Sequence, residues 1–231
     1  LFLGKTTVLC KDTPAFIANR VGVFAIMKVI DSMNKLNLNI DEIDKLTGPV
    51  IGRPKSATFR TSDVVGLDTL IKVAGNLFEG LQNDEGRKYF KLPEVVSKME
   101  QNKWLGDKTN QGFYKKTKNT KGETEILTLD LNTLEYKPKA KTKFATLEST
   151  KSIDNLKQRF KVLFGGKDNA GEFYRDSFFG LFQYVSNRIP EIADELFKID
   201  DAVCAGFGWE LGPFETWDAV NAEETLSAME L

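Results

Sequence analysis

Apolar residues recur at helical spacing through most of the chain, and this pattern predicts a mainly α-helical fold. The first such stretch follows Asp12 and Thr13, either of which can cap a helix, and Pro14, which suits a first turn. We expect this helix to run from residue 14 to about 36, with apolar residues on several faces, as in a buried helix. Further helices are expected over residues 40–46, 67–78, 93–102, 153–164 and, with a kink or break at Pro190, 170–197.

Other stretches depart from this helical pattern. Residues 1–13 are expected to be extended, the stretch TGPVIGRPKSATFRTSDVVGLDT is mostly a glycine- and proline-containing loop, and the polar residues 115–124 are expected to form a surface loop. Alternation from Ile126 to Leu131, followed by a turn at Asn132-Thr133, predicts a small β-hairpin. The basic run KPKAKTK after it is either a solvated linker or a phosphate-binding patch.

The two halves of the chain carry the same signals in the same order. Each half has a long apolar helix, an Ile-Asp pair, a loop that contains glycine and proline, and a Phe four residues before an Asp. The matched positions are Ile40-Asp41 with Ile199-Asp200, and Phe59 and Asp63 with Phe214 and Asp218. We therefore predict a divergent duplication whose copies pack on each other as the subunits of a homodimer would.

Composition narrows the possible chemistry. The 231 residues carry a formal net charge of −1, so no global field should attract nucleic acid or a membrane surface. No apolar run is long enough to span a bilayer. The chain has no histidine, which excludes Ser-His-Asp and Cys-His catalysis and histidine-ligated metals within it.

The cysteines and the first residue bear on the origin of the chain. Cys10 and Cys204 are far apart and have no metal ligands at suitable spacing, so we predict reduced thiols in a cytoplasmic protein and no zinc site. The chain starts at Leu1 without the features of a signal peptide, and we expect it to be a fragment of a longer protein.

Asn19 is the most informative polar residue. On a helix it shares a face with Val23, Ile26 and Ile30, and a buried amide on such a face must find hydrogen-bond partners. It is either a core amide bonded to neighbouring backbone or a polar group in a functional site. The residues alone leave both interpretations open.

Two other sets of residues are interpreted as structural. Gly206, Gly208 and Gly212 lack the spacing of a dinucleotide-binding loop, and a helix is expected before them where that loop needs a strand. Asp63 and Asp68 flank Val-Val-Gly-Leu and are interpreted as helix-capping or turn residues in preference to catalytic ones.

Three motifs carry a resemblance to a known family. KDTPAFIANRV, GRPKSATFRTSDVVGLDT and GDKTNQGFYKK follow one another in the order found in the C-terminal helical region of 3-hydroxyacyl-CoA dehydrogenases. GFGWELGPFETWDAV resembles the corresponding loop of a second copy, as in multifunctional β-oxidation proteins. The chain departs from the pattern at Ala15, where glycine is usual, and its second half lacks the matching Asn-Arg start.

The resemblance implies an all-α fold of two tandem helical domains similar to the C-terminal domain of 6-phosphogluconate dehydrogenase, with a small β-hairpin in the linker. Residues 1–13 would be the tail of an absent Rossmann domain, and residues 14–116 the first helical domain. Residues 117–150 would be the linker, and residues 151–231 a truncated second copy.

The resemblance also implies a function. Family members oxidise (S)-3-hydroxyacyl-CoA to 3-ketoacyl-CoA with NAD, which their N-terminal Rossmann domain binds while supplying the catalytic histidine. Asn19 matches the family asparagine that hydrogen-bonds in the active site, so it is the expected catalytic residue here. The expected partners are the acyl-CoA substrate, an upstream Rossmann domain and an enoyl-CoA hydratase domain of the same chain. The fragment alone is expected to be inactive.

Two other functions remain open. The chain could be a non-catalytic helical interaction module, with Asn19 as a core amide. It could also serve a dehydrogenase of another 2- or 3-hydroxy acid that shares this helical domain. Nucleic-acid binding is supported only by the basic run after Tyr136.

Overall fold

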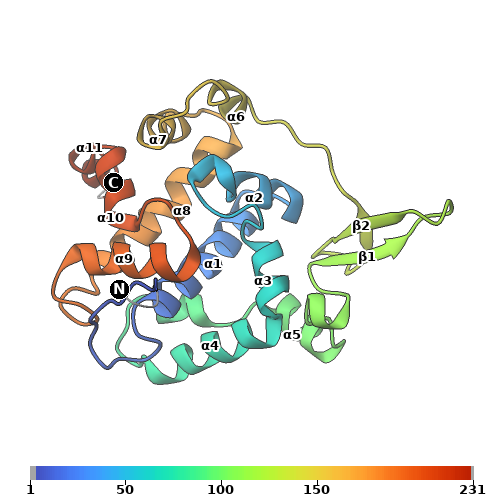
Figure 1. The fold of residues 1–231 in the computed structure, drawn as a ribbon, viewed down its shortest axis with the longest axis horizontal. Helices are drawn as coiled ribbons and strands as arrows, with labels where there is room; N and C mark the ends of the chain where they lie inside the picture. Colours follow the sequence, from blue (N-terminus) through green and yellow to red (C-terminus); the bar gives the residue numbers. More distant parts are fainter. Residues whose placement is uncertain (1–3, 230–231) are drawn as a thin grey trace.

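The computed structural model describes residues 4–229, so the expectations for residues 1–3 and 230–231 lie outside the described part. Helices surround one long central helix, and a small sheet lies at one edge (Figure 1). The α-helices are α1 (Ala18–Lys35), α2 (Ile40–Leu46), α3 (Phe59–Val65), α4 (Leu67–Gly80), α5 (Glu94–Gln101), α6 (Ala145–Ser149), α7 (Leu156–Phe164), α8 (Asn169–Ser186), α9 (Leu196–Phe207), α10 (Pro213–Ala219) and α11 (Ala222–Met229). The strands are β1 (Tyr114–Lys118), β2 (Thr124–Leu129) and β3 (Tyr136–Pro138), and short 3₁₀ turns lie at Pro49–Ile51, Arg87–Phe90 and Asp107–Thr109.

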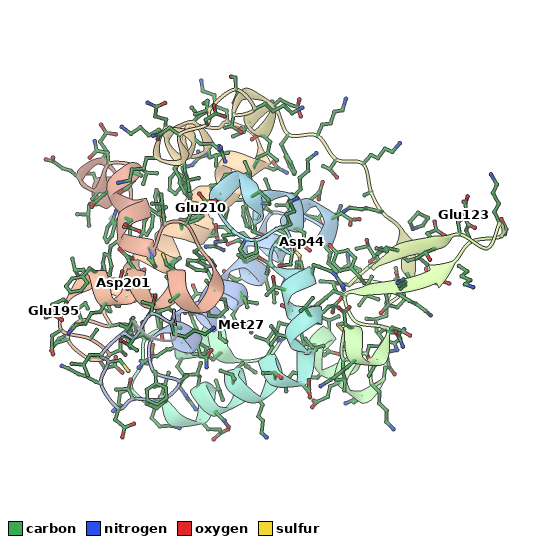
Figure 2. The ribbon with its side chains drawn as sticks, viewed as in Figure 1. Met27, Asp44, Glu123, Glu195, Asp201 and Glu210 are labelled. Atoms are coloured by element: carbon green, nitrogen blue, oxygen red, sulfur yellow. The ribbon has the colours of Figure 1, made fainter. Side chains whose placement is uncertain are left out.

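Helix α1 is buried on most of its circumference because several elements pack around it. Helix α8 crosses it, and α9, α4 and the turn Arg87–Phe90 also contact it. Met27 of α1 lies near the middle of the molecule (Figure 2). The ring of Phe24 stacks on Tyr184 of α8, with the ring centroids 3.8 Å apart. The predicted burial of this helix on several sides is confirmed.

The start of α1 differs from the prediction. Ala15 and Phe16 have φ values of 63° and 54°, in the left-handed region, so the chain turns there and the regular helix begins at Ala18. Neither predicted capping residue bonds the helix start, which has no side-chain cap. The proline that suits a first turn lies instead in the turn before the helix.

The predicted loop after α2 contains helix α3. Asp44 of α2 accepts hydrogen bonds from the backbone N–H groups of Thr58, Phe59 and Arg60, at 3.1, 2.7 and 3.0 Å. Its carboxylate therefore satisfies the free N–H groups at the start of α3. Asp44 lies fourteen residues before Thr58, the residue that precedes α3, so local sequence signals do not reveal this cap.

The predicted hairpin is part of a three-stranded antiparallel sheet in the order β1-β2-β3. Thr128 of β2 is paired with Lys137 of β3 and also with Tyr114 of β1. The prediction of an all-α fold with only a hairpin is therefore wrong at β1, which occupies part of the expected surface loop. Its sequence, YKKTK, lacks the apolar alternation that marked β2.

The remaining helix predictions are close to the structure. Helices α2, α4, α5 and α7 lie where the periodicity places them, with ends that shift by a few residues. The expected break near Pro190 is confirmed, since α8 ends at Ser186 and α9 begins at Leu196. Helix α6 lies in the stretch that was expected to be linker.

The two halves of the molecule make reciprocal contacts. Phe24 of α1 stacks on Tyr184 of α8, and Lys28 of α1 packs against Gly180 of α8. Gly52 lies against Glu210, and Gly208 lies against Pro54. Each residue and its equivalent are 156 positions apart (24 and 180, 28 and 184, 52 and 208, 54 and 210). Such exchanged pairs are the contacts of a two-fold arrangement, and we name α1–α3 the first repeat and α8–α10 the second repeat.

The same spacing corrects one sequence correspondence. Asp200 of α9 accepts from the backbone N–H groups of Phe214 and Glu215, at 2.9 and 3.1 Å, as Asp44 does at the start of α3. The equivalent of Asp200 is thus Asp44, not Asp41. Asp41 instead accepts from Thr128 of the sheet, at 2.9 Å.

A buried ion network joins α1 to the second repeat. Arg20, which follows Asn19 in the family motif, is fully buried and bonds Asp84 at 2.7 Å and Glu191 at 2.6 Å. Asp84 also accepts from Arg188 at 2.8 Å and from the hydroxyl of Tyr184 at 3.0 Å. The arginine of the motif is therefore structural, since it fixes the first turns of α1 against the segment that follows α8.

A second ionic contact between α1 and α8 makes stability depend on pH. Burial alone would raise the pKa of Asp176, but hydrogen bonds from Lys28, Lys35 and Ser32 outweigh it and lower the pKa to about 2. The ionised carboxylate therefore stabilises the folded chain above about pH 4, and this contribution is lost as the pH falls toward 2. We expect Asp176→Asn to lower the unfolding free energy by about 1–2 kcal/mol at neutral pH, less than the full shift because water screens part of the interaction.

The measurement is urea unfolding at a series of pH values from 7 to 2.5, and the gap between wild type and variant should narrow toward the acid end. The control is Asp31→Asn, which removes the more exposed carboxylate that also contacts Lys28, with its side chain 49% exposed. A gap that stays constant over the whole range would contradict the prediction.

Candidate functional site

Asn19 lies in the first turn of α1, exposed to solvent. Its neighbours on the helix face, Val23 and Ile26, line the same cleft as the amide. The residues alone left open whether this side chain is a core amide or a polar group in a functional site. In the described residues its side chain makes no hydrogen bond, and its exposure removes the need for one.

The cleft has a volume of about 290 Å³ and is bounded by α1, the segment before α3, α3 itself, the first turns of α4 and the end of α9. Most of its lining is apolar. The residues that line it are Ala18, Asn19, Val23, Ile26, Pro54, Ser56, Thr61, Ser62, Val65, Thr69, Leu70, Val73, Gly206 and Phe207. The second repeat contributes the last two of these.

The polar groups of the cleft differ in whether they are free to hydrogen-bond a bound molecule. Ser62 donates to the carbonyl of Thr58 at 2.9 Å, and Thr61 donates to the carbonyl of Ala57 at 2.6 Å. These hydroxyls serve α3, whereas the amide of Asn19 can both donate and accept. No described residue in the lining has a side chain that titrates. The cleft can therefore bind and orient a partly apolar molecule, but the described lining offers no general acid or base.

Asp63 connects two of the family motifs. Its carboxylate accepts from the backbone N–H groups of Phe113 and Tyr114, at 2.9 and 2.8 Å. Burial raises its pKa to about 6, although these bonds favour the ionised form. A Cβ on Gly106 or Gly112 would overlap Asp63, and Gly106 has φ of 95°, so both positions require glycine. Asp63 is thus structural, but its bonds span about fifty residues and are not the local turn expected.

Gly206, Gly208 and Gly212 have structural roles in and after α9. Helix α9 precedes Gly208, as predicted, and Gly208 ends that helix in the left-handed conformation. Gly212 packs against Asp200, where a Cβ would overlap the carboxylate. These residues do not fit a pyrophosphate-binding loop. Across residues 4–229 there is also no group of three potential metal-ligating side chains, and no helix with the length and apolar character needed to cross a bilayer.

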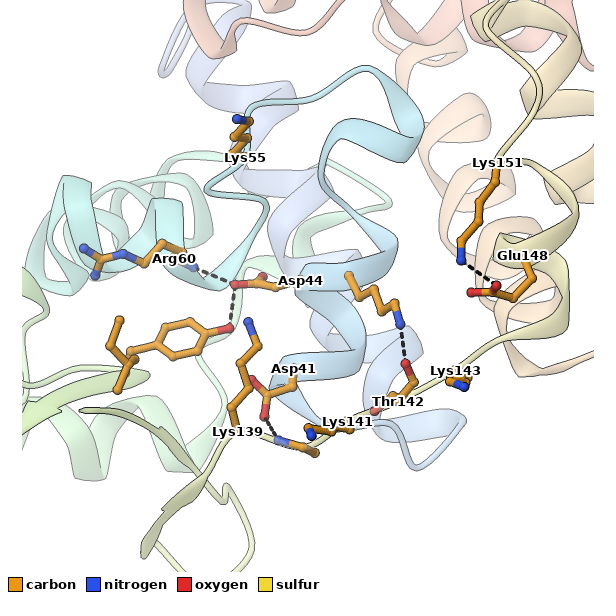
Figure 3. Close-up of a pocket in the computed structure, with 14 residues that line it drawn as sticks. Asp41, Asp44, Lys55, Arg60, Lys139, Lys141, Thr142, Lys143, Glu148 and Lys151 are labelled. Carbon is orange, nitrogen blue, oxygen red and sulfur yellow. Dashed lines mark hydrogen bonds and ion pairs between the residues drawn. The ribbon is translucent and has the colours of Figure 1, made fainter. Parts of the chain in front are cut away.

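The basic run forms one wall of a second, larger groove of about 700 Å³ (Figure 3). Seven lysine or arginine side chains and three carboxylates line it. Asp41 accepts from the backbone N–H of Ala140 at 2.9 Å, and Lys45 donates to the carbonyl of Thr142. These bonds fix the extended linker to α2, which supports the linker interpretation of the basic run.

Both cysteines are free thiols in the described part of the chain. Burial raises the pKa of Cys204 to about 11, which disfavours a reactive thiolate.

Sequence reasoning missed the contribution of the second repeat to the Asn19 cleft. Gly206 and Phe207 lie almost two hundred residues after Asn19, and nothing local marks them as lining residues. The equivalent of Asn19 in the second repeat is Arg175, whose guanidinium donates to the carbonyls of Phe164 and Gly166. The Arg175 side chain therefore stabilises the turn between α7 and α8.

Comparison with known proteins agrees with the motifs. A family model described as "3-hydroxyacyl-CoA dehydrogenase, C-terminal domain" matches residues 16–116. A relative from Bacillus subtilis (strain 168), named "Probable 3-hydroxyacyl-CoA dehydrogenase", is 42% identical over 99% of this chain. A relative from Rickettsia prowazekii, named "Putative fatty acid oxidation complex trifunctional enzyme", is 28% identical over 92% of this chain. This chain spans 28% of the length of each of these two relatives.

A solved structure shares the fold. The crystal structure of 3-hydroxybutyryl-CoA dehydrogenase from Escherichia coli K12 aligns with 98% of this chain and 57% of its own, with a TM-score of 0.66 and 18% identity. At this identity the likeness concerns the fold alone. The motifs, the family match and the Bacillus relative point the same way. Over residues 16–116, the chain belongs to the family of 3-hydroxyacyl-CoA dehydrogenase C-terminal domains.

Proposed function

We propose that this chain is the substrate-binding and dimerisation-like part of an NAD-dependent dehydrogenase that oxidises (S)-3-hydroxyacyl-CoA to 3-ketoacyl-CoA in fatty-acid β-oxidation. The observation that carries this proposal is the exposed amide of Asn19 in an apolar cleft. An apolar wall can hold an acyl chain, and an adjacent amide can hydrogen-bond the oxygen at its reacting end.

The parent protein would supply what this cleft lacks. The described lining has no acid or base, and Gly206, Gly208 and Gly212 do not fit a pyrophosphate-binding loop. From the resemblance to 3-hydroxyacyl-CoA dehydrogenases, we place the NAD site and the histidine base in an upstream Rossmann domain of the parent. Residues 1–13 would be its tail, residues 14–116 the first helical domain, residues 117–150 the linker, and residues 151–231 the second copy.

A further domain is part of the same proposal. The Rickettsia relative carries the name of a trifunctional enzyme, and this supports further enzymatic domains elsewhere in the parent chain. The family resemblance implies that one of them is an enoyl-CoA hydratase. The reciprocal contacts between the two repeats support the dimerisation-like role, in which the second repeat would take the place of a partner subunit.

The test combines this chain with the separately expressed upstream domain and follows NADH oxidation by acetoacetyl-CoA. We expect turnover only when both pieces are present, because binding and proton transfer lie on different pieces. Turnover by this chain alone would contradict the proposal. So would an absence of turnover when both pieces are folded and associated, a result that would favour a non-catalytic helical interaction module.

A further inference from the structure

The second repeat reaches into the Asn19 cleft through the last residues of α9. A Cβ on Gly22 of α1 would overlap the ring of Phe207, and a Cβ on Gly206 would lie 2.9 Å from the Cβ of Ala18. The absence of side chains at these two glycines lets α9 dock closely on the first turns of α1. The ring of Phe207 is thereby held beside the cleft.

Phe207 stands between two cavities. It lines the 290 Å³ cleft that contains Asn19, and it also lines a smaller cavity of about 30 Å³ beyond it. Gly22 and Ala25 of α1, together with Trp209, also line that smaller space. The two cavities share four lining residues, Ile26, Pro54, Thr61 and Phe207.

Among these four residues, Phe207 is the one whose truncation would connect the two cavities. Ile26 belongs to α1 itself, and the hydroxyl of Thr61 is bonded within its own segment. Phe207 is the only aromatic side chain of the four and the only one from the second repeat. It is half-buried at the end of its helix.

We propose that Phe207 ends the acyl-binding part of the Asn19 cleft and so sets the length of acyl chain that the parent dehydrogenase accepts. This inference rests on the proposed function, because it takes the occupant of the cleft to be an acyl chain. A chain that lies beside Asn19 and extends from the larger cleft toward the smaller cavity at Gly22 and Ala25 meets the ring of Phe207, which lines both. The second repeat, in which the residue equivalent to Asn19 is Arg175 bonded to backbone carbonyls, thus acts as the end wall for the first.

The experiment measures kcat/KM of the complete parent protein for 3-hydroxyacyl-CoA substrates of increasing chain length. Phe207→Ala joins the two cavities, so the ratio of kcat/KM for a long chain to that for a four-carbon chain should rise about tenfold or more. Phe207→Trp makes the wall larger, so the same ratio should fall. Phe197→Ala is the matched control, because it removes an exposed phenylalanine of the same helix outside the cleft.

The outcomes separate this inference from the function on which it rests. If the wild-type parent oxidises no 3-hydroxyacyl-CoA of any length, the proposed function fails. If the wild type is active and both Phe207 variants keep its chain-length ratio, or both shift it in the same direction, the inference is overturned. Opposite shifts in the two variants, with Phe197→Ala like wild type, support it. Thermal unfolding of each variant identifies a loss of folding, and Phe207→Leu then replaces the alanine variant.

Discussion

Replacement of Asp84 by alanine should lower the unfolding free energy by about 3–5 kcal/mol, because it leaves two buried guanidinium groups without their shared carboxylate. Arg20 and Arg188 have side chains only 0% and 5% exposed, and both bond the same oxygen of Asp84. The hydroxyl of Tyr184 loses its acceptor as well. Urea unfolding of this chain at neutral pH, followed by circular dichroism, measures the change.

The neighbouring residue provides the control. Glu85 also bonds Arg188, but its side chain is 51% exposed, so water can replace it. We expect Glu85→Ala to change the unfolding free energy by about 1 kcal/mol or less. If Asp84→Ala and Glu85→Ala lower the unfolding free energy by equal amounts, the buried network does not contribute the stability expected of it.

Replacement of Asn19 by alanine in the complete parent dehydrogenase should lower kcat by about 10²- to 10³-fold, the usual effect of removing one oriented hydrogen-bonding group at a reacting oxygen. The folded chain should be nearly as stable as wild type, since the amide is exposed and makes no hydrogen bond within the described residues. Steady-state kinetics and a thermal unfolding curve together test both statements.

Asn34→Ala is the matched control, because Asn34 is an exposed asparagine near the other end of the same helix. We expect its kcat to equal that of the wild type. Unchanged turnover in Asn19→Ala at unchanged stability would remove the amide from the reaction and favour the interaction-module hypothesis. A large loss of stability would instead show that the amide supports the fold.

The fold was predictable from sequence wherever the decisive contacts are local. Apolar periodicity located α1, α2, α4 and α5 because each helix buries one or more faces of its own. Helix α3 was missed because Asp44, in the preceding helix, satisfies its first N–H groups. Strand β1 was missed because its stability comes from pairing with β2, and its polar residues show no alternation.

The candidate site was predictable only in part. The family motif singled out Asn19, and the structure places it in a cleft with Val23 and Ile26, its predicted neighbours on the helix. The motif did not show that Asn19 and the adjacent Arg20 have different roles. Arg20 belongs to a buried ion network. Phe207 could not be found from sequence, because its place beside Gly22 depends on how α9 docks against α1.

The duplicated architecture frees its two copies from a constraint that binds identical subunits. In a dimer of one chain, a change at any position appears in both active sites at once. Here position 19 carries asparagine, while its equivalent 175 carries an arginine bonded to nearby backbone carbonyls. Under the proposed function, one repeat therefore contacts the substrate while the other supports it. The packing of the two repeats is close to two-fold, whereas the side chains at the equivalent positions 19 and 175 differ in their chemistry.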